Sequence, residues 1–142
     1  AWGLAGIRVG YAVAQETIIE YLNKIKLPYN LNLISSKLAI EALDKNQKMQ
    51  EFREIILSER EKLSNNLTNL GFKVFPSEAN FLLVKYPNTS DIVKKLAVDY
   101  EIIIRDFNSK PLLKDCVRIS VGSPEQNDLL IKSLNKILSK IL

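Results

Sequence analysis

The chain has 142 residues, of which 46% are hydrophobic and 25% charged, and a formal net charge of +4, which together are typical of a globular domain. With no histidine and a single cysteine, Cys116, it offers no imidazole base, no ordinary zinc cluster and no internal disulfide. The lysines are scattered and no apolar run reaches the roughly 20 residues of a membrane span, so we expect no nucleic-acid or membrane partner and a cytoplasmic location.

The first segment, AWGLAGIRVGYAVA, alternates larger apolar residues with small ones from Ile7 to Val13, which predicts a strand. Helical spacing of isoleucine and leucine then predicts a helix from Gln15 to Ile25. A proline and asparagines in Lys26 to Asn32 indicate a connector between two bodies. We therefore place a domain boundary near residue 30, with an α/β remnant of a larger domain over 1–30.

Residues 31–142 are predicted to form a small α+β domain in which helices pack on a mostly antiparallel sheet. A helix over 33–44 is followed by a long one that ends at Gly71, a plausible left-handed cap. Ser123 and Gln126 form a capping box that predicts the start of the last helix. Short strands and one more helix fill the interval; the strands are predicted at 72–75, 80–86, 102–106 and 116–121, and the helix at 90–100.

Only five of the twenty basic residues are arginines, so the positions of the arginines are informative. Arg118 stands in the middle of the core-like strand CVRISVG, where a buried guanidinium needs an anion, either a structural partner or a ligand. Arg105 closes the run IIIRD, and a solvated salt bridge with Asp106 is the alternative to a ligand. Arg8 follows the small residues GLAG and could bind a phosphate bidentately, or it could be a surface arginine beside a turn.

The remaining arginines, Arg53 and Arg60, alternate with glutamates along the long helix, which favours its solvated face. Cys116 begins an apolar strand and has no histidine to activate it, so we expect it to pack rather than react.

Five segments in order along the chain, AWGLAGIRVGYA, PYNLN, PSEANFLLV, IIIRDF and CVRISVGSPEQN, together resemble the histidinol-phosphate aminotransferases, which are fold-type I pyridoxal-phosphate enzymes. The resemblance covers nearly the whole chain. It implies a homodimeric enzyme of histidine biosynthesis that transfers an amino group between histidinol phosphate and 2-oxoglutarate with pyridoxal 5'-phosphate as cofactor.

By the same resemblance, Arg8 would bind the cofactor phosphate, Arg118 the α-carboxylate of the substrate, and Arg105 the distal phosphate of the substrate. The Schiff-base lysine would precede Ala1, so no catalytic residue is assigned and the chain is expected to be an inactive carboxy-terminal portion. Residues 1–30 would then be a remnant of the large cofactor-binding domain with its connector, and 31–142 the small domain.

Two other interpretations stay open. Threonine-phosphate decarboxylases and aspartate-type aminotransferases share this fold and the carboxylate-binding arginine. Alternatively, the chain is a non-catalytic α/β binding module whose arginines make structural ion pairs.

Overall fold

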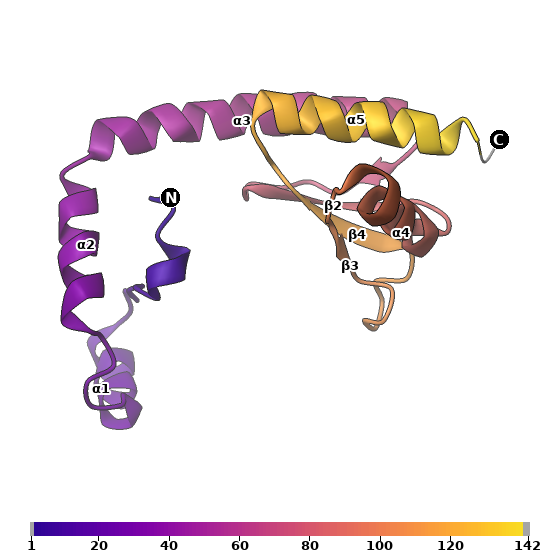
Figure 1. The fold of residues 1–142 in the computed structure, drawn as a ribbon. Helices are drawn as coiled ribbons and strands as arrows, with labels where there is room; N and C mark the ends of the chain where they lie inside the picture. The colour runs from indigo at the N-terminus through magenta and orange to yellow at the C-terminus, as the bar shows by residue number, and fades with distance from the viewer. Residues whose placement is uncertain (1, 141–142) are drawn as a thin grey trace. The chain divides into compact units, whose positions relative to one another are not determined.

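The computed structural model describes residues 2–140, and the chain divides into two compact units, Ala1–Arg53 and Glu54–Leu142 (Figure 1). Each unit is described by itself. The domain boundary expected near residue 30 remains a prediction. Among the described residues, no helix is both long and apolar enough to cross a membrane.

The first unit contains a short 3-10 helix η1 (Ala5–Ile7), the helices α1 (Glu16–Ile25) and α2 (Leu33–Leu43), and the beginning of α3 (Asn46–Asn69). The two helices predicted here are confirmed. Asn32 explains where α2 begins, because its side-chain oxygen accepts a hydrogen bond from the Ser35 amide at 2.8 Å.

The strand predicted over Ile7 to Val13 is wrong. Alternation predicts an extended chain, but a strand also needs a neighbour for its backbone hydrogen bonds, and no described residue pairs with this segment. Tyr11 and Val13 are 91% and 87% exposed, so the pattern marks a surface without a partner among residues 2–140.

The second unit is built on a four-stranded sheet of β1 (Lys73–Val74), β2 (Phe81–Lys85), β3 (Arg105–Asp106) and β4 (Cys116–Ser120). Its strand order is β1-β2-β4-β3, and every neighbouring pair is antiparallel, as predicted for the small domain. In the central pair, Leu82 lies opposite Ile119 and Val84 opposite Val117, which places all four side chains on one face.

That face is the core face. It packs against α3, α4 (Thr89–Tyr100) and α5 (Pro124–Leu138) (Figure 1). The apolar side chains that these helices contribute with the least exposure are Leu63, Leu67, Ile92, Leu96, Leu134 and Ile137. Three helices on one face leave the opposite face of the sheet open, and we call this the open face.

The helix ends follow the sequence signals. Gly71 ends α3 with a φ of +86°, which a side chain would make unfavourable. Ser123 and Gln126 form both hydrogen bonds of the predicted capping box at the start of α5.

The strand predicted from Ile102 is shorter than expected. The Ile102 amide donates to the carbonyl of Leu96 and so closes α4, and Ile103 is 88% exposed. Arg105 and Asp106 form the whole of β3, and the Phe107 amide adds one further hydrogen bond to β4, to the Cys116 carbonyl at 3.0 Å.

Candidate functional site

Two arginines face each other on the open face of the sheet. Arg105 of β3 is the direct cross-strand partner of Arg118 of β4, so both side chains project on the same side. The Arg118 guanidinium also stacks on Phe81 of β2, with its carbon 5.2 Å from the ring centroid. The sheet therefore brings together two of the three arginines singled out in the sequence.

Arg118 is exposed, so the prediction that its charge is buried is wrong. The alternation along the strand was correct, since Val117 and Ile119 enter the core while Arg118 and Ser120 do not. The core lies only on the helix side of the sheet, and this side of the strand has no layer above it within the second unit.

Neither arginine has a carboxylate partner in the part of the chain that the structure describes. Within residues 2–140, no Asp or Glu oxygen lies within 4.0 Å of either guanidinium. Asp106, the expected partner of Arg105, is the neighbour of Val117 and lies on the other face. Like charges placed directly opposite repel, and a guanidinium pair without a counter-ion is suited to an oxyanion with two or more oxygens.

The two arginines line a groove of about 560 Å³ along the edge of the sheet beside α5. We call it the arginine groove. Both polar and apolar side chains line it; the lining includes Ser120, Gly122, Gln126, Asn127, Ile104 and Leu129. A groove of this size accommodates a small metabolite with an anionic group.

A polar cluster surrounds Asp106, the residue that follows Arg105 on β3. The Asp106 carboxylate accepts hydrogen bonds from the Ser90 hydroxyl at 2.7 Å and from the Asn108 amide at 2.8 Å. The Asn108 side chain in turn donates to Ser90 and accepts from the Asp115 amide. The bonds from Asn108 and Ser90 hold the pKa of Asp106 below its usual range, so the carboxylate is charged at neutral pH.

Sequence reasoning missed this cluster and read Asp106 only as a partner for Arg105. The available signal was the spacing, since an Asp at a strand end with an Asn two residues later is a pattern that binds the local backbone.

Arg8 lies in the first unit, directly after η1, in the left-handed region at φ 60°. That conformation costs a non-glycine residue roughly 1 kcal/mol. Its Nη1 donates to the Ala5 carbonyl at 3.2 Å, and the side chain is exposed. The remaining N–H donors of this exposed guanidinium are of the kind that a phosphate accepts from.

The other candidates have structural roles. Cys116 is buried and free, as expected for a packing residue. Arg60 is not on a solvated face: it donates to the Ala79 carbonyl at 3.0 Å and lies 3.5 Å from the Glu78 carboxylate, which ties α3 to the loop before β2. Among residues 2–140, no group of three acidic or sulfur side chains could hold a metal ion.

The sequence matches the family described as "Aminotransferase class I and II" over residues 1–134. A histidinol-phosphate aminotransferase from Caldanaerobacter subterraneus subsp. tengcongensis is 45% identical over 140 residues, which cover 98% of this chain and 39% of that protein. The chain therefore spans about two fifths of the length of such relatives.

Two solved structures have the same fold. One is a histidinol-phosphate aminotransferase from Sinorhizobium meliloti in complex with pyridoxal-5'-phosphate, with a TM-score of 0.83 and 28% identity, covering 99% of this chain and 39% of that one. The other is a decarboxylase from Sulfurospirillum multivorans, with a TM-score of 0.81 and 29% identity, covering 96% of this chain and 40% of that one.

Proposed function

Because the chain belongs to the class I and II aminotransferase family, we propose that the whole protein transfers an amino group between histidinol phosphate and 2-oxoglutarate. The observation that carries this proposal is the cross-strand pair Arg105 and Arg118, which has no carboxylate partner among residues 2–140. The names of the similar enzymes supply the choice of substrate.

Both substrate classes present anions that match such a pair. Glutamate and 2-oxoglutarate carry two carboxylates, and histidinol phosphate carries one phosphate. Arg118 binds the α-carboxylate of the amino acid or 2-oxo acid through two parallel N–H···O bonds, and Arg105 binds the phosphate or the second carboxylate. Two fixed cations in one groove orient the substrate more strictly than one, because each removes a rotational freedom of the bound molecule.

Pyridoxal phosphate, when bound, supplies the electron sink for cleavage at the amino-bearing carbon. Arg8 would hold its phosphate, since this guanidinium is exposed and, among residues 2–140, donates to a single backbone carbonyl, that of Ala5. By resemblance, the lysine of the Schiff base stands immediately ahead of Ala1, in the part of the protein that these 142 residues do not include. The chain alone then contributes anion binding without proton transfer, and we expect no transamination above background from it.

The test is a substrate profile of the full-length protein. With 2-oxoglutarate as acceptor, histidinol phosphate should give a higher kcat/KM than aspartate, phenylalanine or tyrosine. Equal or higher values for these amino acids would refute the substrate assignment. Sedimentation of the same preparation tests the homodimer that we propose with it.

A decarboxylase is the second candidate, because one of the two solved structures described above is a decarboxylase at similar identity. It would use the same arginines to bind a phosphorylated amino acid such as O-phosphothreonine. Release of carbon dioxide from that compound, without any requirement for 2-oxoglutarate, would favour it over the aminotransferase.

A further inference from the structure

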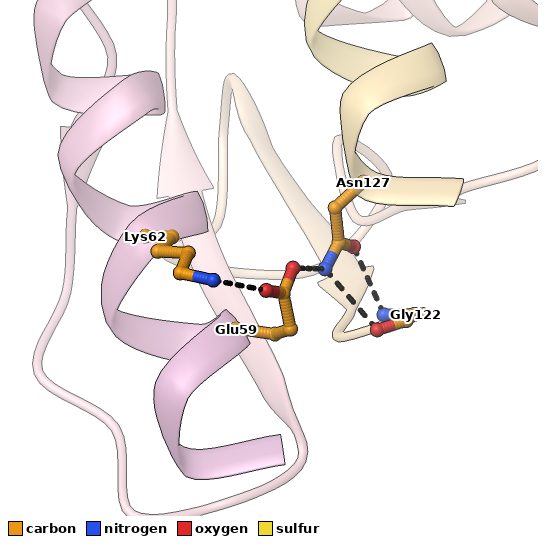
Figure 2. A network of polar contacts seen from close by, with 4 residues as sticks. All are labelled: Glu59, Lys62, Gly122 and Asn127. Atoms are coloured by element: carbon orange, nitrogen blue, oxygen red, sulfur yellow. Dashed lines mark hydrogen bonds and ion pairs between the residues drawn. The ribbon is translucent and has the colours of Figure 1, made fainter. Parts of the chain in front are cut away.

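A polar network built around two buried side chains joins α3, α5 and the turn that follows β4 (Figure 2). Glu59 and Asn127, only 5% and 6% exposed, come from positions 68 residues apart. One carboxylate oxygen of Glu59 accepts from Lys62 at 2.9 Å, and the other accepts from the Asn127 amide nitrogen at 2.9 Å. We call these three residues, with the backbone of Gly122, the Asn127 network.

The carboxylate in this network is charged. Hydrogen bonds from Lys62 and Asn127 lower the pKa of Glu59 against the effect of burial. A buried carboxylate with a donor on each oxygen is well satisfied, whereas removal of the Asn127 donor would leave one buried oxygen without a hydrogen bond.

The side-chain amide of Asn127 forms hydrogen bonds with both backbone groups of Gly122. Its oxygen accepts from the Gly122 amide at 3.0 Å, and its nitrogen donates to the Gly122 carbonyl at 3.1 Å (Figure 2). Glu59 determines which way round the amide lies, because a carboxylate can only accept and must face the nitrogen. The oxygen of Asn127 is thereby left for the Gly122 amide.

The turn held in this way is the end of the strand that carries Arg118. The Val121 amide donates to the Asn80 carbonyl at 2.9 Å, so the segment is fixed by the β2 side at Val121 and by α5 at Gly122. A Cβ on Gly122 would lie 2.7 Å from the Gln126 side-chain oxygen, so turn and helix are already in close contact. Gly122 and Asn127 line the same groove as Arg118.

We propose that Glu59 and Asn127 are positioning residues for Arg118: they fix the end of β4 against α3 and α5, and so set where its guanidinium meets the anion in the arginine groove. This inference rests on the proposed function, because the anion is the substrate carboxylate. The Asn127 network can affect Arg118 directly through the backbone, since Arg118 lies four residues before Gly122 on a paired strand.

The experiment uses the full-length protein and measures KM and kcat for 2-oxoglutarate together with its dissociation constant by calorimetry. Asn127→Asp places a second carboxylate against Glu59 and against the Gly122 carbonyl. We expect about a tenfold increase in KM and in the dissociation constant, with kcat within about threefold. Asn135→Asp is the matched control, because this exposed amide on the same helix binds only the Ile131 carbonyl; it should change neither constant.

A reversed pair and a double-mutant cycle separate positioning from general stability. Glu59→Gln combined with Asn127→Asp restores an amide and carboxylate pair with the roles exchanged and should recover part of the lost affinity. In an Arg118→Lys background, Asn127→Asp should add less than about twofold, because its effect passes through Arg118. A merely structural residue would cost the same factor in both backgrounds.

Equal factors in the two backgrounds, or an unchanged dissociation constant in Asn127→Asp, would overturn the proposal. If Asn127→Asp does not fold, Glu59→Gln replaces it in the same cycle. This variant should raise KM and the dissociation constant about threefold, and equal factors in the two backgrounds would again overturn the proposal. A wild-type protein that binds 2-oxoglutarate but does not use histidinol phosphate would refute only the proposed function. A wild-type protein that does not bind 2-oxoglutarate would overturn the positioning role.

Discussion

Replacement of Arg118 by alanine should reduce activity far more than stability. In the full-length protein, loss of a bidentate carboxylate contact in the arginine groove should cost roughly 2 to 4 kcal/mol of transition-state binding, or about 30- to 900-fold in kcat/KM. The free energy of unfolding should hardly change, because two small effects oppose each other. The stacking of Arg118 on Phe81 is lost, worth about 0.5 to 1 kcal/mol, while the repulsion from Arg105 is relieved, worth about 0.2 to 1 kcal/mol.

The assay compares kcat/KM for 2-oxoglutarate with the free energy of unfolding in urea. The matched control is Lys85→Ala, which removes an exposed cation from the same open face, opposite Lys73 and away from the arginine groove. We expect this control to leave kcat/KM within about twofold. If Arg118→Ala left kcat/KM unchanged, or if Lys85→Ala reduced it equally, a specific contact between Arg118 and the substrate would be excluded.

Three further predictions concern the stability of the 142-residue chain, followed by circular dichroism in urea. Leu67→Ala should destabilise it by about 2 to 5 kcal/mol, because Leu67 is fully buried between α3 and the sheet, whereas Leu112→Ala, at a fully exposed position, should stay within about 0.5 kcal/mol; similar values for the two would contradict the assigned core. Ser123→Ala removes the capping box of α5 and should cost about 1 kcal/mol, more than Ser139→Ala at the other end of the helix, and the reverse order would be inconsistent with capping. Asp106→Asn should cost about 1 to 2 kcal/mol at pH 7. Because the pKa of Asp106 is lowered in the folded protein, the stabilisation by its carboxylate is present above the unfolded pKa and is lost as the pH falls through the folded pKa. The free energies of unfolding of wild type and variant should therefore converge in acid. A difference that stays constant with pH would contradict this role of the carboxylate.

Local signals in the sequence were reliable where they describe short-range chemistry. The capping box at Ser123, the left-handed Gly71 and the helix from Leu33 were all predictable, because each depends on residues within one or two turns. The two short edge strands were predicted at about the right place, although β3 was predicted too long.

Features that depend on distant partners were not predictable. The alternation in Ile7 to Val13 could not reveal that a pairing strand is absent from residues 2–140. The opposition of Arg105 and Arg118 depends on the register of two strands, which no local pattern fixes. The burial of Arg118 was wrongly predicted, because alternation identifies two faces but does not say whether a second layer covers both.

Arg53 and Arg60 were assigned to a solvated face on which they alternate with glutamates, yet one of these glutamates, Glu59, is buried. A signal for it did exist. It lies three residues after Ile56 and four before Leu63, on the apolar stripe itself, and a charge at such a position calls for a buried partner. Its partner Asn127 could not be identified, because the contact spans 68 residues of sequence.

The open face with its two opposed guanidinium groups has a practical consequence for solution work on this protein. Phosphate and sulfate are oxyanions with several acceptor oxygens, like the groups that the pair is suited to bind, and at the millimolar levels of common buffers they compete with a substrate of similar charge. Apparent dissociation constants measured in phosphate buffer will therefore be larger than the intrinsic ones. Added salt will raise them further, because it screens the attraction between the arginines and the substrate anion. Zwitterionic buffers at constant low ionic strength are the appropriate medium in which to compare variants of Arg105 and Arg118.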